Sequence, residues 1–147
     1  MGRLLGGLVI TQLWGVQQSE LDDVWHDVLP FIQRVVDKGS DKTAKEIYQG
    51  LKKRRYQLWI AWDEQIRACC ITETIHHEPD GFLCTIVMCA GDNLRRWINH
   101  IKTIEEWAES KGCFAIELVG RKGWEKILKY KVTGHDGNEL IMRKMLK

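Results

Sequence analysis

The segment 89–97, CAGDNLRRW, has the residue types of an anion-binding site. An apolar stretch ends there, a glycine follows, and a helical pattern begins at Leu94. The first N–H groups of a helix have no intrahelical acceptor, and the helix dipole favours negative charge beside them. Arg95 and Arg96 stand in the same turn, where a cation without a nearby anion costs roughly 0.3–1 kcal/mol. The segment therefore predicts phosphate or carboxylate binding at residues 91–96.

The same residues also have a purely structural interpretation, which the sequence leaves open. In that case Gly91 makes a tight turn and Asp92 caps the helix. Both arginines then extend into water or meet acidic side chains.

Cysteines and histidines are not spaced as metal ligands. Cys69 and Cys70 are adjacent, as are His76 and His77, and no Cys-x-x-Cys pair occurs. We therefore expect no metal site, and nothing in the spacing orients a histidine toward a thiol. The densest basic run, residues 52–55, falls at an expected helix end, which accounts for it better than contact with nucleic acid.

Apolar periodicity predicts the elements that position these residues. A spacing of three and four predicts helices over 19–39, with a kink or break at Pro30, and over 41–55, with Asp41 as its cap. The expected strands are residues 8–14, 56–62, 65–76, 82–89 and 114–119, and a closing hairpin follows. Because a helix over 94–112 joins two buried strands, residues 82–119 predict a βαβ unit with parallel pairing.

Composition is that of an ordinary globular protein, with 44% hydrophobic and 29% charged residues among 147. We expect one domain over residues 1–147. A net charge of +2 does not require a polyanionic partner. Five cysteines cannot all pair, which fits reduced thiols, and no apolar run approaches the ~20 residues of a membrane span. We therefore expect a cytoplasmic protein that does not bind membranes.

The order of elements and several short segments resemble the GNAT superfamily of N-acetyltransferases. The likeness is greatest to the small GNAT-like proteins encoded by bacteriophages, and it spans nearly the whole chain. The segments are QLWIAW, ITE, the glycine loop leading to a Trp-bearing helix, IEEWAESKGC and GRKGWEKIL. The resemblance implies an α/β (α+β) fold with a mixed, mostly antiparallel twisted sheet, helices on both faces and the βαβ unit at 82–119.

The glycine loop departs from the superfamily's usual signature, which is Gln or Arg, two residues, Gly, one residue, then Gly or Ala. When the loop is aligned on Gly91, Met88 takes the first place and Asn93 the last. Donation by the backbone N–H groups of residues 91–94 does not depend on those side chains.

The resemblance further implies that acetyl-CoA is the cofactor and that its acetyl group passes to an amine. Its pantetheine is expected along three residues of the buried strand, Val87, Met88 and Cys89. Its phosphates are expected at the loop and helix start, at Gly91, Asp92, Asn93, Leu94, Arg95 and Arg96.

Acetyl transfer to an amine needs a base for the ammonium proton and an acid for the thiolate. The family places a carboxylate on its central strands, which makes Glu73 and Glu117 candidate bases. It also places a tyrosine in the following helix; in this chain the candidate acid is Tyr130, which falls at or near the start of the next expected strand. Each has a structural alternative, as a solvated or paired carboxylate or as a half-buried aromatic ring.

A second hypothesis is a catalytically degenerate GNAT scaffold that binds a virion component or a host protein. It is motivated by the departures at Met88 and Asn93. The amine acceptor, a small molecule or a protein, is not identified by the sequence. The resemblance also implies a homodimer paired through C-terminal strands, and for a phage-encoded protein the host cytoplasm or the virion as its location.

Overall fold

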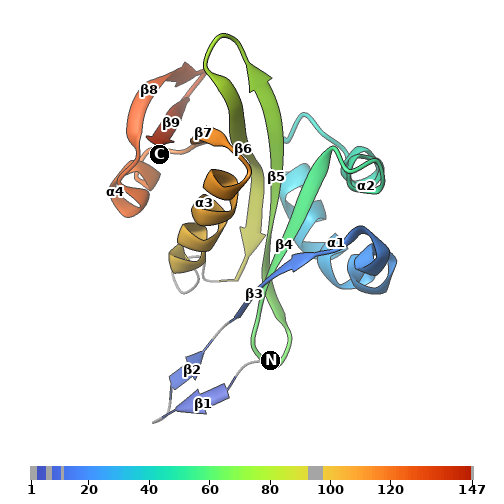
Figure 1. The fold of residues 1–147 in the computed structure, drawn as a ribbon. Coiled ribbons are helices and arrows are strands. Elements are labelled where there is room, and N and C mark those ends of the chain that lie inside the picture. The colour runs from blue at the N-terminus through green and yellow to red at the C-terminus, as the bar shows by residue number, and fades with distance from the viewer. Residues whose placement is uncertain (1–2, 6–7, 11, 93–97, 147) are drawn as a thin grey trace. The chain divides into compact units, whose positions relative to one another are not determined.

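The computed structural model describes residues 3–5, 8–10, 12–92 and 98–146 (Figure 1). Its main sheet has seven strands in the order β3-β4-β5-β6-β7-β9-β8, and β1 and β2 form a separate two-stranded sheet. The strands are β1 (Arg3–Leu5), β2 (Leu8–Ile10), β3 (Gln12–Val16), β4 (Tyr56–Trp62), β5 (Ile66–His77), β6 (Gly81–Gly91), β7 (Cys113–Gly120), β8 (Lys131–Asp136) and β9 (Glu139–Met145). The helices are α1 (Leu21–Asp37), α2 (Ala44–Lys52), α3 (Ile101–Ser110) and α4 (Trp124–Leu128), with short 3-10 turns at Gln18–Glu20 and Ile98–His100.

The pairing of the strands confirms the predicted fold class. β6 is the central strand of the seven. It pairs in parallel with β7, and α3 lies between the two strands in the sequence. β3 with β4, β7 with β9 and β8 with β9 are antiparallel. The chain therefore has the predicted mixed, mostly antiparallel sheet with a βαβ unit.

Contacts within the chain group its residues into two compact units. The first unit comprises Met1–Ile71 and Met88–His100, and the second comprises Thr72–Val87 and Ile101–Lys147. Strands β5 and β6 each contribute residues to both units.

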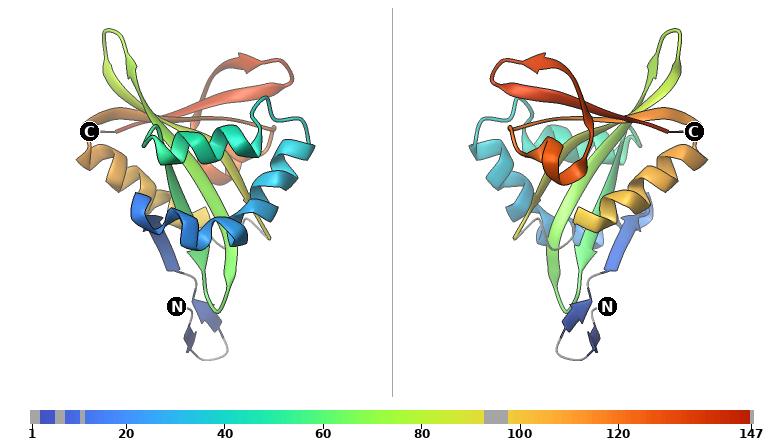
Figure 2. Two further views of the ribbon diagram at one scale, coloured as in Figure 1. Left: turned by 90° about the vertical axis from the view of Figure 1, so that its right-hand side faces the viewer. Right: turned by 90° about the vertical axis from the view of Figure 1, so that its left-hand side faces the viewer.

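The first unit contains α1 and α2, which lie side by side (Figure 2). Lys52 Nζ and the Tyr48 hydroxyl of α2 donate to the two carboxylate oxygens of Asp22 on α1, at 2.7 and 2.6 Å. Val28, Ile32 and Ile47 of these helices are fully buried. The side chains that join the helices are therefore polar at the surface and apolar inside.

Pro30 lies within α1, which is one helix, so of the two predicted alternatives, a kink or a break, the break is wrong. The cap of α2 also differs from the sequence prediction. Thr43 rather than Asp41 caps α2, because its hydroxyl accepts from the Glu46 N–H at 3.1 Å while the Glu46 carboxylate accepts from the Thr43 N–H at 3.0 Å. This reciprocal pair satisfies two backbone donors, which Asp41 alone would not do.

The second unit is built around β7. Helix α3 packs on β7, and the core includes the fully buried Ile104, Ile116 and Met142. The α3 face that is buried also carries one charged residue, Glu105, which is 8% exposed. Across the described residues, no helix combines the length and apolar character needed to cross a membrane.

Candidate functional site

The residues predicted to contact pantetheine, 87–89, lie near the end of β6, where buried and half-buried residues alternate. Ile86, Met88 and Ala90 are buried, whereas Val87 and Cys89 are half-buried on the opposite face. This alternation follows from the period of two in a β-strand. The side chains of Val87 and Cys89 therefore share one partly open face of β6 with Thr85 and Gly91.

Gly91 ends β6 at a position where no side chain fits. A Cβ atom there would lie 2.4 Å from the Ala68 Cβ and 2.8 Å from the Arg67 carbonyl oxygen, both on β5. The next residue, Asp92, donates its N–H to that same carbonyl at 3.0 Å. Gly91 is thus needed for the close approach of the β5 and β6 backbones. The residue that follows β6 remains hydrogen-bonded to β5.

Two ion pairs of the first unit lie around this exit from β6. Asp92 Oδ1 accepts from Arg34 Nη1 of α1 at 3.2 Å, and both side chains are at least half exposed. Arg67 Nε donates to the buried Asp63 Oδ1 at 2.8 Å. The turn that bears Asp63 and the turn that bears Asp92 are therefore joined through Arg67.

Asp63 is a structural carboxylate of this region that the sequence analysis missed. It is 2% exposed, and its Oδ1 also accepts the backbone N–H groups of Glu64 and Gln65. Burial opposes its charge, but the hydrogen bond from Arg67 and these two backbone donors outweigh burial and lower the pKa of Asp63. A strand that ends in Asp, with Arg four residues later, is the signal that could have identified it.

The remaining predicted phosphate contacts, Asn93, Leu94, Arg95 and Arg96, lie outside the described residues. Gly91 and Asp92 are therefore the part of the predicted loop whose surroundings are known.

The pairing of β6 with β7 ends before either strand does. Its register runs from Phe82↔Cys113 to Ile86↔Leu118, whereas β6 continues to Gly91. Within the described part of the chain, no further register pair joins these strands. Backbone groups of β6 beyond Ile86 therefore have no ladder partner among the described residues of β7.

Thr85 is a residue of β6 whose side-chain hydroxyl lacks a partner among the described residues. Its Oγ1 atom is buried and forms no hydrogen bond with any of them. Such atoms are rare in proteins and often mark a place for water or a ligand. In the register Thr85 is opposite Glu117 of β7, one of the two candidate bases.

Glu117 is held by an arginine of the neighbouring strand. Its Oε2 accepts from Arg143 Nε at 2.9 Å and from Nη2 at 2.7 Å, and both side chains are largely buried. Thr85, Glu117 and Arg143 occupy matched positions on β6, β7 and β9. The other candidate base, Glu73, is half-buried on β5.

Tyr130 is a buried residue whose hydroxyl is hydrogen-bonded inside the protein. It is 5% exposed, and its hydroxyl donates to Glu105 Oε2 at 2.5 Å. Lys144 Nζ of β9 donates to the other oxygen of Glu105 at 2.7 Å. Glu105 thus links Tyr130 to Lys144, a cluster that the sequence analysis missed although a charged residue on the apolar stripe of a helix could have signalled it.

The cysteines of this region are free thiols. Cys89 Sγ lies 3.3 Å from Cys70 Sγ on β5, at hydrogen-bonding distance. Burial raises the pKa of Cys69 and that of Cys84 to about 12. Of the five cysteines, Cys89 alone is not fully buried.

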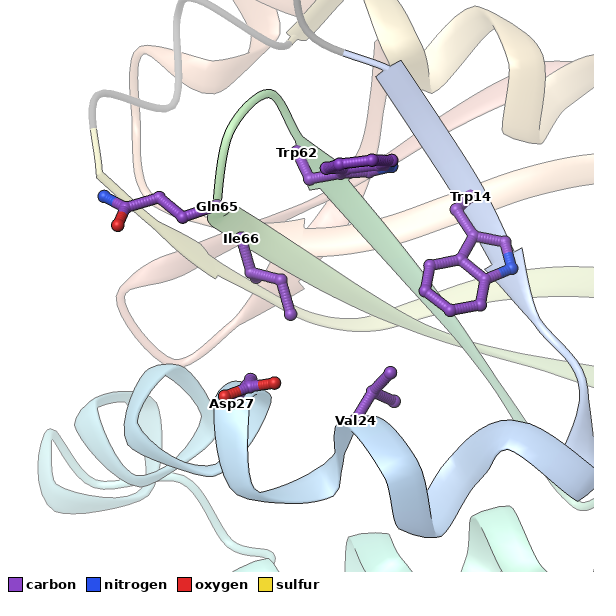
Figure 3. A pocket seen from close by; sticks show the side chains of 6 residues that line it. All are labelled: Trp14, Val24, Asp27, Trp62, Gln65 and Ile66. Atoms are coloured by element: carbon purple, nitrogen blue, oxygen red, sulfur yellow. The ribbon is translucent and has the colours of Figure 1, made fainter. Parts of the chain in front are cut away.

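A pocket of about 440 Å³ opens in the first unit, beside the turn that bears Asp63 (Figure 3). It is lined by side chains of β3, α1, β4, the β4–β5 turn and β5, namely Trp14, Val24, Asp27, Trp62, Gln65 and Ile66. The sequence analysis predicted none of these residues as a site, because they are scattered over three segments that only the fold brings together.

Comparison with known proteins gives matches by structure but not by sequence. No protein-family model and no curated protein matches the chain. A probable acetyltransferase from Staphylococcus epidermidis superposes with a TM-score of 0.68 at 10% identity, over 94% of this chain and 100% of that one. An N-acetyltransferase from Staphylococcus aureus gives 0.65 at 13% identity, over 92% and 97%. A predicted acetyltransferase from Clostridium acetobutylicum, solved with acetyl-CoA, gives 0.60 at 16% identity, over 82% and 87%.

These likenesses cover nearly the whole of each chain. Solved structures of the GNAT family from other bacteria match to a similar degree. At such low identity they bear on the fold and not on the reaction. The chain has the fold of the GNAT acetyltransferases.

Proposed function

We propose that this protein is an acyl-CoA-dependent N-acyltransferase that transfers an acetyl group from acetyl-CoA to an amine. The observation that carries the proposal is the stretch of β6 beyond Ile86, which has no register partner on β7 among the described residues. The unpartnered Thr85 Oγ1 on the same strand supports it. A structure of the same fold, from Clostridium acetobutylicum, contains acetyl-CoA.

The residues of β6 fit the pantetheine part of the cofactor. Pantetheine carries amide groups, which can pair with the exposed backbone of a strand as another strand would. Val87 and Cys89 are half-buried and present a small apolar side chain and a small thiol beside that backbone. Thr85 Oγ1 adds one hydroxyl that can donate or accept.

Phosphates are proposed to bind where the chain leaves β6, at residues 91–96. The net charge of the protein is only +2, so a phosphate needs local positive charge, and Arg95 and Arg96 supply it. Asp92 is a negative charge in the same stretch, and Arg34 pairs with it at 3.2 Å. This pairing lessens the repulsion that a phosphate would otherwise meet.

When bound, acetyl-CoA supplies an acyl thioester. The chain would supply a base that takes the proton of the ammonium, and the proposed groups are Glu73 and Glu117. Arg143 holds Glu117 in one orientation through two hydrogen bonds. Tyr130 is proposed to protonate the thiolate, and to do so it must give up its hydrogen bond to Glu105.

Calorimetric titration with acetyl-CoA tests cofactor binding. We expect binding of the unmodified protein and a Kd at least tenfold higher for the Arg95→Ala, Arg96→Ala double variant, because each charged hydrogen bond contributes about 1.5–3 kcal/mol. The double variant Lys38→Ala, Lys53→Ala removes the same charge from exposed positions and should bind as the unmodified protein does. S-acetylpantetheine, which lacks the nucleotide, should bind both double variants equally. Absence of acetyl-CoA binding at millimolar concentration would refute the proposal.

Release of free CoA in the presence of a panel of amines tests the transfer itself. We expect Glu73→Gln or Glu117→Gln to lower kcat, because an amide cannot accept the proton of the ammonium. If neither substitution changes turnover, the proposed bases are wrong although the activity stands.

A catalytically degenerate binding protein is the second candidate. The observation that favours it is that Glu117 and Tyr130 are both engaged with partners inside the protein, Arg143 and Glu105. Stable binding of acetyl-CoA without turnover of any amine, or copurification with a host or virion protein without CoA binding, would support it.

The resemblance to bacteriophage proteins also leads us to propose the host cytoplasm as the site of action and a small molecule or a protein as the amine acceptor. We further propose a homodimer formed through the C-terminal strands, which sedimentation velocity would test.

A further inference from the structure

The pocket in the first unit combines two indole rings with a carboxylate. Figure 3 shows Trp62 on one side of it, Asp27 and Val24 of α1 on the facing side, and Trp14 and Ile66 between them. Trp14 of β3 and Trp62 of β4 are on the same face of the sheet, because Gln12 pairs with Trp62 and Trp14 with Ile60. The volume of about 440 Å³ is within the range of small-molecule sites, roughly 300–1,000 Å³.

The electrostatic character of this pocket favours a cation. Indole faces carry negative potential and attract cations within about 6 Å of the ring centre. Asp27 adds a full negative charge, and no described residue forms an ion pair or hydrogen bond with its side chain. Arg34, seven residues further along α1, hydrogen-bonds Asp92 instead. The pocket therefore lacks a counter-cation of its own among the described residues.

The lining further favours a cation that needs few hydrogen bonds. A primary ammonium has three N–H donors, and each must find an acceptor when it leaves water. The acceptors among the lining side chains are the two oxygens of Asp27 and the amide oxygen of Gln65, so a primary ammonium would need all of them; Trp14, Trp62, Val24 and Ile66 offer none. A quaternary ammonium has no donors, is weakly hydrated and makes its contacts through methyl groups.

We propose that this pocket binds a small soluble molecule bearing a quaternary ammonium group. The two tryptophan rings contact the methyl groups, and Asp27 provides the counter-charge. All six lining residues belong to the first unit, and none is among the residues proposed to bind acetyl-CoA. The proposal does not rest on the proposed acyl transfer, and its test requires no cofactor.

Three alcohols of similar size test the proposal by calorimetry and by ligand-observed NMR. Choline carries a trimethylammonium group, 3,3-dimethylbutan-1-ol is its uncharged isostere, and ethanolamine is its primary-amine counterpart. We expect choline to bind with a Kd on the order of 1 mM, and the other two at least fivefold more weakly. Equal binding of the uncharged alcohol would overturn the role of charge, and equal binding of ethanolamine would overturn the preference for a quaternary group. Absence of choline binding at tens of millimolar would overturn the proposal.

Substitutions locate the binding. Asp27→Asn and Trp62→Leu should each raise the Kd for choline about fivefold or more, and choline should shift the indole NH resonances of Trp14 and Trp62. Asp23→Asn, which removes the same charge from an exposed position of the same helix outside the pocket, should leave the Kd unchanged. If Trp62→Leu fails to fold, Asp27→Asn still decides, because its side chain is exposed. Unchanged choline binding in Asp27→Asn would place the ligand elsewhere.

Vesicles of phosphatidylcholine distinguish a soluble ligand from a lipid headgroup. We expect the protein to remain in the supernatant when such vesicles are sedimented. Binding to vesicles without binding of free choline would overturn the assignment to a small soluble molecule.

Discussion

Asp63 shows how one buried carboxylate organises a turn. It accepts hydrogen bonds from Arg67 and from the N–H groups of Glu64 and Gln65, and Gln65 in turn accepts from the Asp63 N–H at 3.2 Å. Removal of the carboxylate would leave Arg67 and the N–H groups of Glu64 and Gln65 without this acceptor. The turn between β4 and β5 is therefore specified by its first residue.

Asp63→Ala should lower the free energy of unfolding by about 1–3 kcal/mol, because the N–H groups of Glu64 and Gln65 and the Arg67 guanidinium lose their acceptor. Asp63→Asn should cost less, since its amide oxygen can still accept from the backbone. Chemical denaturation at pH 7 measures both. Equal losses in the two variants would contradict this account of the turn.

The lowered pKa of Asp63 also predicts a pH dependence. Because the folded-state pKa lies below the ordinary value of about 4, the charged form stabilises the fold above that pH, and the contribution is lost as pH falls through the folded pKa. The stability of Asp63→Asn should therefore decrease less between pH 5 and pH 2 than that of the unmodified protein. Parallel decreases would show that other carboxylates dominate acid unfolding.

Cys89 offers a chemical reporter of the proposed cofactor strand. Burial raises the pKa of Cys69 and Cys84 to about 12 and shields their thiols, whereas Cys89 is half-buried. Iodoacetamide at pH 8 should label Cys89 first, as measured by peptide mass spectrometry. Acetyl-CoA should slow that labelling if pantetheine lies along β6, and unchanged labelling at saturation would argue against that placement.

At the scale of elements, the contact between β5 and β6 depends on Gly91. Its absent side chain allows the two backbones to approach, and a Cβ would meet Ala68 Cβ at 2.4 Å. Gly91→Ala should therefore push the strands apart and lower the melting temperature, by an amount equivalent to about 1–3 kcal/mol. Gly134→Ala on β8 is the matched control, because its Cβ would meet only Ile141 Cδ1 at 3.5 Å. Similar melting temperatures for the two variants would disprove the requirement for glycine at position 91.

Three elements of the second unit meet at Glu105. Tyr130 follows α4, Glu105 lies on α3 and Lys144 lies on β9, and both oxygens of the carboxylate are occupied. Tyr130→Phe leaves one oxygen of a largely buried carboxylate without its donor, and we expect a loss of about 1–3 kcal/mol of stability. Denaturant unfolding measures this loss. If kcat falls while stability does not, the hydroxyl acts in the reaction rather than in the fold.

Local periodicity was sufficient to predict most of these elements. The apolar run at 82–89 identified the central strand, and the strand–helix–strand order identified the parallel pair. The helix cap was misassigned because Asp41 and Thr43 are both good capping residues, and only the position of Glu46 three residues after Thr43 distinguishes them.

At the scale of the whole molecule, the order of elements was enough to predict the fold, but not the side-chain partners. The partner of Glu117, Arg143, is 26 residues away, and that of Glu105, Lys144, is 39 residues away. Such pairs depend on strand register and on the packing of helices on strands, which a single sequence does not encode in any short motif. The pocket formed by Trp14, Asp27 and Trp62 was not predictable for the same reason.

The early end of pairing between β6 and β7 has a consequence for the exchange of backbone amides with solvent deuterium. Residues 83–86 of β6 lie between two hydrogen-bonded neighbouring strands, β5 and β7. Residues 87–90 have no register partner among the described residues of β7. Amides in the second group that point toward β7 should exchange faster than those in the first, although both belong to the central strand. Mass spectrometry of overlapping peptides would measure the difference. Equal protection along the strand would mean that these amides are already satisfied, and would leave no free backbone for a ligand to use.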